Sequence, residues 1–173
     1  RSRVTNPDDP DSEEVYMDAA VARWHPYSKK FEVFADGTSN PWGVDFDYAG
    51  NAFISACVID HMWHMAPGGQ YLRQGGTWRN PYGYADMHSK RGGLPSIVDH
   101  RHHLAAYCGV QLYQGNQYPA EHLGSVLCGN IHDNSIHQDV LTPNGSSFKS
   151  SEKQDFVRAN DGWFRPVSLQ IGP

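Results

Sequence analysis

The sequence predicts an all-β fold, a section of a β-propeller built from about three blades of four-stranded antiparallel sheet, with a long loop inserted between two blades. Three observations lead to this prediction. The 173 residues contain 17 glycines, 11 prolines and a 12% aromatic share, which is typical of short strands joined by tight turns. Apolar and polar residues alternate in segments such as "GVDFDY", as they do in half-buried strands. Finally, one pattern of strands and turns occurs more than once.

The repeated pattern covers residues 43–69 and 109–145. Each copy begins with Gly-Val and an alternating strand, reaches a glycine before a second apolar strand, continues into a strand with histidine, and closes at a turn. The middle glycine and the closing proline are Gly50 and Pro67 in one copy, and Gly124 and Pro143 in the other. Repeats of about four strands over about 40 to 50 residues are typical of propeller blades.

A third copy starts at residues 166–173 and lacks its second strand. A first strand without its partner leaves backbone donors and acceptors unpaired, so we expect the remainder of a parent polypeptide, or other subunits, to complete the ring. The expected organisation is an acidic lead-in over residues 1–20, a blade over 21–74, a histidine-rich insertion over 75–108, a blade over 109–161, and the start of a further blade over 162–173.

Charge and composition narrow the expected partners. The chain has 14 Lys and Arg against 19 Asp and Glu, a formal charge of −5, and no basic run, so neither nucleic acid nor an anionic membrane surface is expected to bind. No apolar run approaches the roughly 18 to 20 residues of a membrane span. We expect a small neutral ligand. The three cysteines are widely spaced, form no Cys-x-x-Cys motif, and are predicted to be buried free thiols.

The densest chemical cluster is "DHRHH" at residues 99–103. In an extended backbone, alternation places His100 and His102 on one side and Asp99 with Arg101 on the other. These four residues are the predicted catalytic set: a neutral His100 or His102 acts as general base on a hydroxyl, and Arg101 orients a cofactor carboxylate or stabilises negative charge. The alternative is a hydrogen-bond network that holds a long loop in place.

Two further histidine pairs are candidates. His61 and His64 lie three apart, so in a strand they face opposite sides and at most one reaches a central channel; with Arg101 they are the predicted cofactor-binding residues. The alternative for each is packing between blades. His132 and His137 flank a turn on adjacent strands, and with Asp133 or Asp139 nearby they form a candidate metal site, against the alternative of hydrogen-bonded strand histidines.

Long motifs carry a resemblance to a known family. They include "GTSNPWGVDFDYAGNAFISACVIDHMWHMAPGG", "PSIVDHRHH" and "GNIHDNSIHQDVLTPNGSSF". The chain resembles the N-terminal propeller of planctomycete-type membrane-bound dehydrogenases, which carry a haem-binding Cys-x-x-Cys-His module and whose propeller is similar to those of quinoprotein sugar dehydrogenases.

The resemblance implies a bacterial protein that works in the periplasm or elsewhere outside the cytoplasm. It implies oxidation of a sugar or alcohol, with pyrroloquinoline quinone and calcium as cofactors and electrons passed to a c-type haem elsewhere on the parent chain. The isolated section is then expected to be inactive. No quinone-binding residue is assigned in this chain.

Two other functions remain open. One is a non-catalytic propeller that binds a glycan or a partner protein through an aromatic rim at Trp78, Tyr82 and Tyr84. The other is a calcium-dependent hydrolase with Asp60, Asp99 and Asn130 as ligands.

Overall fold

The computed structural model describes residues 2–17, 19–58, 60–72, 93–102 and 104–172. These residues form strands and a single turn of 3-10 helix, η2 at Ala120–His122, which confirms the all-β prediction for them. The described residues contain no helix long and apolar enough to cross a membrane. The strands are β1 Ser2–Val4, β2 Val15–Met17, β3 Ala20–His25, β4 Lys30–Asp36, β5 Pro41–Phe46, β6 Ala52–Ala56, β7 Met62–Met65, β8 Tyr107–Leu112, β9 Ser125–Asn130, β10 Ser135–Asn144 and β11 Ser147–Arg158.

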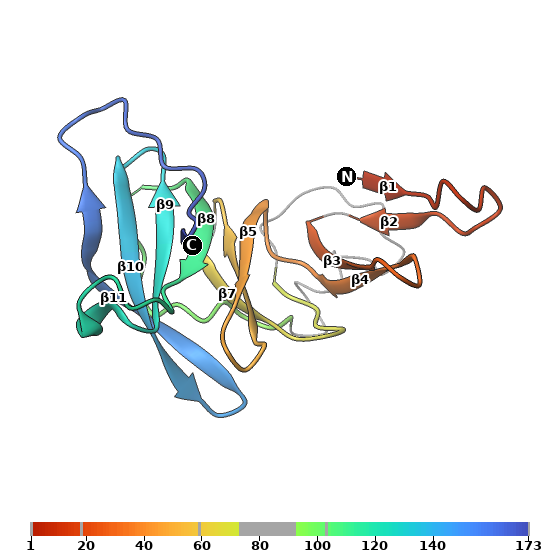
Figure 1. Cartoon of the computed structure of the whole chain (residues 1–173), viewed down its shortest axis with the longest axis horizontal. Helices are drawn as coiled ribbons and strands as arrows, with labels where there is room; N and C mark the ends of the chain where they lie inside the picture. The colour runs from red at the N-terminus through yellow and green to blue at the C-terminus, as the bar shows by residue number, and fades with distance from the viewer. Residues whose placement is uncertain (1, 18, 59, 73–92, 103, 173) are drawn as a thin grey trace. The chain divides into compact units, whose positions relative to one another are not determined.

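The strands form four small antiparallel sheets, in which neighbours along the chain are neighbours in the sheet (Figure 1). Two are hairpins, β1-β2 and β3-β4. The third has the order β5-β6-β7 and the fourth the order β11-β10-β9-β8. None of them closes into a barrel.

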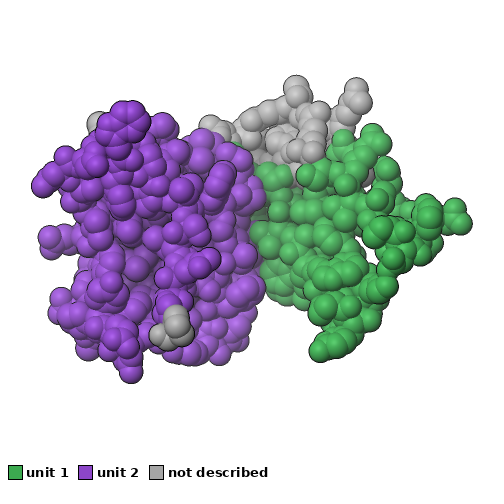
Figure 2. Space-filling view, turned by 45° about the horizontal axis from the view of Figure 1, so that its top comes forward, with its two compact units in different colours: residues 1–39, 66–95 green, residues 40–65, 96–173 purple. Residues whose placement is uncertain are grey.

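The chain divides into two compact units, residues 1–39 with 66–95 and residues 40–65 with 96–173 (Figure 2). The first unit contains β1 to β4 and the second contains β5 to β11. Residues 1–20, expected as an acidic lead-in, include the hairpin β1-β2. The strands of residues 21–74, expected as one blade, belong to two sheets in different units. Residues 109–161 do form most of one four-stranded sheet.

The first unit is held by backbone pairing beyond its two hairpins. The end of β4 pairs with the segment after β7, because Asp36 N donates to Gly69 O and Tyr71 N donates to Asp36 O. Gly37 has a φ of 117°, a conformation that favours glycine, and a Cβ at this position would lie only 2.3 Å from Tyr71 O.

The second unit has a core shared by its two sheets. Phe53 and Met62 come from the three-stranded sheet, and Val110, Leu112 and Val126 come from the four-stranded sheet. Each is at most 5% exposed, and burying such a side chain stabilises the fold by roughly 1.5 to 3 kcal/mol. The central strands β6 and β9 are buried along their whole length.

Residues 162–172 form no strand, although they were expected to start a further blade. They pass close to the backbone of the four-stranded sheet instead: the Cys108 thiol donates to Pro166 O at 2.9 Å. The approach depends on Gly129 in β9, because a Cβ there lies only 2.5 Å from Pro166 O and 2.8 Å from Cys108 O. All three cysteines are free, as predicted; Cys108 and Cys128 are buried and Cys57 is half-buried.

We predict that Gly129→Ala lowers the free energy of unfolding by about 1 to 3 kcal/mol, since two backbone segments must move apart to admit a methyl group. The matched control is Gly162→Ala, where nothing lies within 4 Å of the added Cβ and a change within about 0.5 kcal/mol is expected. Urea unfolding of both variants measures the difference. Equal stability of the two variants contradicts this account of the chain end.

Candidate functional site

The backbone around "DHRHH" is fixed by strands from both sheets of the second unit. Ile97 N donates to Met62 O at 3.1 Å, which ties the segment to β7. Ser150 N in β11 donates to Ile97 O at 2.7 Å, and Asp99 N donates back to Ser150 O at 3.1 Å. The segment is therefore held between β7 and β11, just before the two histidines.

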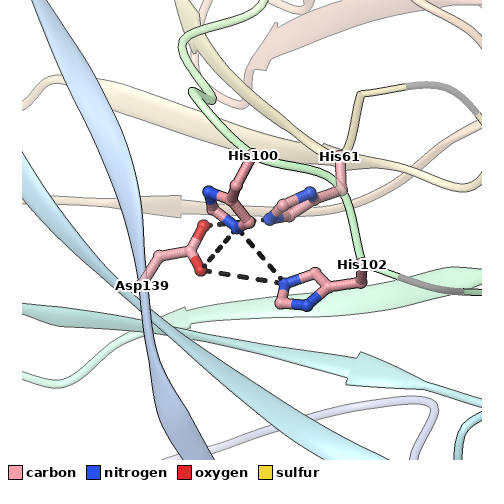
Figure 3. A group of neighbouring side chains, drawn as sticks. All are labelled: His61, His100, His102 and Asp139. Atoms are coloured by element: carbon pink, nitrogen blue, oxygen red, sulfur yellow. Dashed lines mark hydrogen bonds and ion pairs between the residues drawn. The ribbon is translucent and has the colours of Figure 1, made fainter.

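Three histidines and one aspartate converge at this point (Figure 3). His61 precedes β7, His100 and His102 follow the tied segment, and Asp139 extends from β10. One nitrogen or oxygen atom from each of the four lies within 4.8 Å of the others. We call these four residues the histidine cluster.

Two of the distances within the histidine cluster match those between the ligands of a metal ion. The Nε2 atoms of His100 and His102 are 3.3 Å apart, and His100 Nε2 is 3.3 Å from Asp139 Oδ1. A tetrahedral zinc ion with bonds of about 2.0 to 2.1 Å has ligand atoms about 3.3 Å apart. Figure 3 shows the imidazole rings of His100 and His102 and the carboxylate pointing toward one another. His102 Nε2 lies 4.0 Å from Asp139 Oδ1, and His61 Nε2 lies 2.9 Å from Asp139 Oδ2, so a four-ligand set requires these two imidazoles to move toward a common ion.

Asp139 is 2% exposed and holds negative charge inside the fold. Burial alone raises the pKa of its carboxyl group, but hydrogen bonds from His100 and His61 outweigh burial and hold that pKa well below the ordinary range. His61 Nε2 lies 2.9 Å from Oδ2, which also accepts a hydrogen bond from Ser150 Oγ at 2.7 Å. The other oxygen, Oδ1, is buried and makes no well-aligned hydrogen bond; its nearest partner is His100 Nε2 at 3.3 Å, which forms an ion pair with it when that imidazole is protonated.

Carboxylates also contact the far side of two imidazole rings. His100 Nδ1 lies 3.1 Å from Asp99 Oδ1, and His102 Nδ1 lies 3.3 Å from Glu152 Oε1. Contacts of this kind orient metal-binding histidines and fix which nitrogen carries the proton. Asp99 is itself held by Lys149 and by Ser151, and the hydrogen bond with Lys149 is the main reason why its pKa lies below the ordinary range.

The two histidines of "DHRHH" differ in protonation. Burial opposes the charged form of His100, but Asp139 overcomes that effect and raises the pKa of His100 to about 9. Burial, together with the positive fields of His137 and His61, lowers the pKa of His102 to about 4. His102 also stacks on His137, with ring centroids 3.7 Å apart and planes 12° apart. A neutral imidazole such as that of His102 is the form that binds a metal or accepts a proton.

A cavity of about 250 Å³ opens beside the histidine cluster. Its lining includes His61, His102, Arg101, Asp60 and Tyr107. The guanidinium of Arg101 is fixed by donation from Nε to Asp60 Oδ1 at 2.8 Å, although its side chain is 83% exposed. Tyr107 stacks on His61, and burial raises the pKa of Tyr107 to about 12, so its hydroxyl keeps its proton at neutral pH.

A second acidic group lies behind the histidine cluster. It consists of Asp133, His137 and Asp155, whose ligand atoms also lie within 4.8 Å of one another. Here a cation is already present in the chain: Arg158 donates to both oxygens of Asp133 at 3.2 and 3.0 Å and to Asp155 at 2.8 Å. The arginine satisfies both carboxylates, which makes this group a closed ion-pair network.

Comparison with known proteins identifies the family of this chain. The family described as "Domain of unknown function (DUF7133)" matches residues 3–173. The chain belongs to this family. No curated protein and no solved structure matches the chain.

The DUF7133 domain brings together residues that the sequence placed in separate sets. His100 and His102 meet on one side of their segment, as alternation predicts, and His61 joins them from 39 residues earlier in the chain. Asp99 contacts His100, and Arg101 lines the adjacent cavity. The role of each residue stays a prediction.

Other candidates lie outside the histidine cluster. His64 Nδ1 lies 3.0 Å from Ser147 Oγ and its ring stacks on Phe53, so it is separated from His61 as expected for strand neighbours on opposite sides. His132 is exposed, and its backbone amide donates to Asn130 Oδ1. The candidate metal set of His132, His137 and Asp133 is thus not assembled; His137 and Asp133 meet Asp155 instead.

The remaining alternatives concern other residues. Trp78, Tyr82 and Tyr84 lie outside the described residues. Asp60 contacts Arg101 and Ser96, while Asn130 donates to Leu104 O and accepts from the turn after β9. Together with Asp99 they form none of the carboxylate and histidine groups found among the described residues.

Sequence reasoning missed Tyr107, Glu152, Asp155 and Arg158. The sequence of β10 does contain a pattern that points to Asp139. In a strand, alternation puts His137 and Asp139 on the same face, so a carboxylate beside a histidine could have been predicted there. Glu152 pairs with Asp139 across β10 and β11, but that register becomes visible only in the structure.

We predict that Arg158→Gln lowers the free energy of unfolding by about 1 kcal/mol, because two half-buried carboxylates then face each other without a cation. Restoring the charge balance with Asp133→Asn and Asp155→Asn in the same chain should recover most of this loss. Urea unfolding of the three proteins provides the test. If Arg158→Gln unfolds like the parent protein, the network does not contribute to stability.

Proposed function

We propose that the DUF7133 domain binds one divalent transition-metal ion through His61, His100, His102 and Asp139, and that this centre activates an oxygen atom of a small molecule in the adjacent cavity. The observation that carries the proposal is the convergence of three histidines on one buried carboxylate, with a nitrogen or oxygen atom from each of the four residues within 4.8 Å of the others. A carboxylate surrounded by imidazole nitrogens is a donor set that suits a transition-metal ion.

The donor set indicates which ions fit. Imidazole suits zinc, copper, iron and nickel, whereas calcium takes six to eight oxygen ligands. Three histidines and one aspartate therefore fit a transition metal, and the calcium ion implied by the family resemblance does not fit at this cluster. Zinc with four protein ligands is tetrahedral. A further ligand binds to such an ion only when its coordination number rises to five.

The cavity favours a catalytic centre over a purely structural one. Structural zinc sites are closed, whereas His61 and His102 line a cavity here. A bound divalent ion acts as a Lewis acid on an oxygen ligand and lowers the pKa of that ligand. Arg101, fixed by Asp60, stands where it can stabilise negative charge on a bound molecule, and the Tyr107 hydroxyl can donate a hydrogen bond. The volume of about 250 Å³ admits one end of a small substrate.

A second candidate follows from the family resemblance: oxidation of a sugar or alcohol by an exported parent protein. It is favoured by the common cavity of His61, Arg101 and His102, since the neutral His102 can accept the proton of a substrate hydroxyl. A quinone bound by the parent protein against the substrate carbon would accept the hydride, and a c-type haem elsewhere on the parent chain would take the electrons. A metal ion held by the histidine cluster would orient the hydroxyl.

We infer that the β8–β11 sheet is one blade of a propeller completed by other parts of the parent protein. What supports this inference is the order of its strands, which are four consecutive antiparallel neighbours over residues 107–158. Radial sheets with this strand order are the repeating unit of propellers. A non-catalytic propeller that binds a glycan or a partner protein is the remaining alternative.

We predict that the chain binds one divalent ion and that His61→Gln and His100→Gln each weaken the binding at least about 100-fold, since loss of an outer-shell partner alone costs 10 to 100-fold. The matched control is His132→Gln, because His132 is exposed and outside the histidine cluster. Equilibrium dialysis against zinc, manganese, copper and calcium, with elemental analysis, gives affinity and stoichiometry. A preference for calcium, or equal affinity in all three variants, contradicts the proposal.

We further predict that metal binding releases about one proton per ion near pH 7 and tightens as pH rises toward 9. With a pKa of about 9, His100 is protonated at neutral pH in the metal-free protein, and an ion must displace that proton. Above that pH His100 is neutral, so protons no longer compete with the metal ion for its nitrogen. Calorimetric titration in two buffers of different ionisation enthalpy measures the released protons. Binding without proton release shows that His100 is not a ligand.

A further inference from the structure

We propose that a second cavity of the β5–β11 unit, separate from the histidine cluster, is a binding site for a neutral saccharide. It has a volume of about 510 Å³ and shares no lining residue with the cavity beside the cluster. Small-molecule sites typically measure about 300 to 1,000 Å³, so this cavity can take a whole sugar ring. It is formed by the end of β8 and the loop after it, by β9, β10 and β11, and by residues 169–172. The inference does not rest on the metal centre.

Aromatic rings form one wall of this saccharide cavity. Tyr118 contacts Tyr113 edge to face at 5.3 Å and Phe156 at 5.1 Å. The backbone amide of Tyr118 donates to the Tyr113 hydroxyl at 2.7 Å, which fixes the loop that carries the ring. Tyr113 is buried, whereas Tyr118 is 51% exposed. The electron-rich face of such a fixed ring attracts the polarised C–H groups on one face of a sugar ring.

Carboxamides supply the polar part of the lining. They are Gln111, Asn116, Gln117 and Gln170. A carboxamide both donates and accepts hydrogen bonds, as does a sugar hydroxyl, so the two groups match in either direction. Gln111 is oriented in advance, because its amide nitrogen donates to Asp45 Oδ2 at 2.7 Å and to Leu112 O at 3.3 Å.

Charge decides between classes of ligand. Among the described residues that line the saccharide cavity, none is an aspartate, glutamate, lysine, arginine or histidine. A charged ligand would lose hydration there without gaining an ionic partner, which is unfavourable. Leu127 and Ile136 from adjacent strands add apolar surface. A ligand with one apolar face and several neutral hydroxyl groups satisfies all of these surfaces, and a pyranose has that composition.

The test is titration of the full chain with glucose, galactose, mannose, cellobiose and lactose, followed by calorimetry and saturation-transfer NMR. We expect saturable binding of at least one of them, with a Kd on the order of 1 mM, and weaker binding of glucuronate. Tyr118→Ala should weaken binding about tenfold, or about 1.4 kcal/mol. Tyr27→Ala is the matched control, since Tyr27 is 93% exposed in the β3-β4 turn.

A charge variant and a chelator control test the ligand class and the location of the site. Asn116→Asp adds a charge at an exposed position and should also weaken binding of neutral sugars; circular dichroism checks that each variant is folded. Excess chelator should leave saccharide binding unchanged, because the metal centre lies elsewhere. The proposal is overturned by absence of saturable binding, by tighter binding of glucuronate, or by equal affinity in folded Tyr118→Ala and Tyr27→Ala. Binding that disappears with chelator places the sugar at the histidine cluster instead.

Discussion

The chemistry of this domain depends on keeping one carboxylate, that of Asp139, ionised in the interior. A buried charge without partners destabilises a fold by several kcal/mol, so its neighbours are constrained as strictly as the residue itself. His61, His100 and Ser150 meet this requirement from three different parts of the chain. The same constraint leaves one carboxylate oxygen directed at imidazole nitrogens, and this geometry is the basis for inferring a metal centre.

Strand register determines whether that arrangement exists. Asp139 pairs with Val126 on β9 and with Glu152 on β11. A slip of one residue would turn Asp139 to the opposite face of the sheet and bring Val140 into the cluster. In the shared core, Phe53 and Met62 pack against the β8–β11 sheet. This packing holds the loop before β7 close enough to β10 for His61 to contact Asp139. The contacts of the histidine cluster therefore depend on the packing of the shared core.

The sequence predicted what local periodicity determines. Alternation placed His100 and His102 on a common side, and the blade expected over residues 109–161 overlaps the four-stranded sheet of residues 107–158. It failed where distant segments meet. His61 was separated from the "DHRHH" residues, and Asp139 was considered only beside His132 and His137, because nothing local records which strands approach. Residues 162–172 have a strand-like pattern, yet they lie against Gly129 without pairing as a strand.

The histidine cluster and its carboxylate neighbours come from points in the chain as far apart as His61 and Glu152. A ribosome that adds about 5 to 20 residues per second needs roughly 5 to 18 seconds to pass from one to the other. During that interval the nascent chain displays His100 and His102 without the aspartate that completes the set. The proposed binding of an ion is thus a late event in biogenesis, because it needs the β10-β11 hairpin to have emerged from the ribosome and folded.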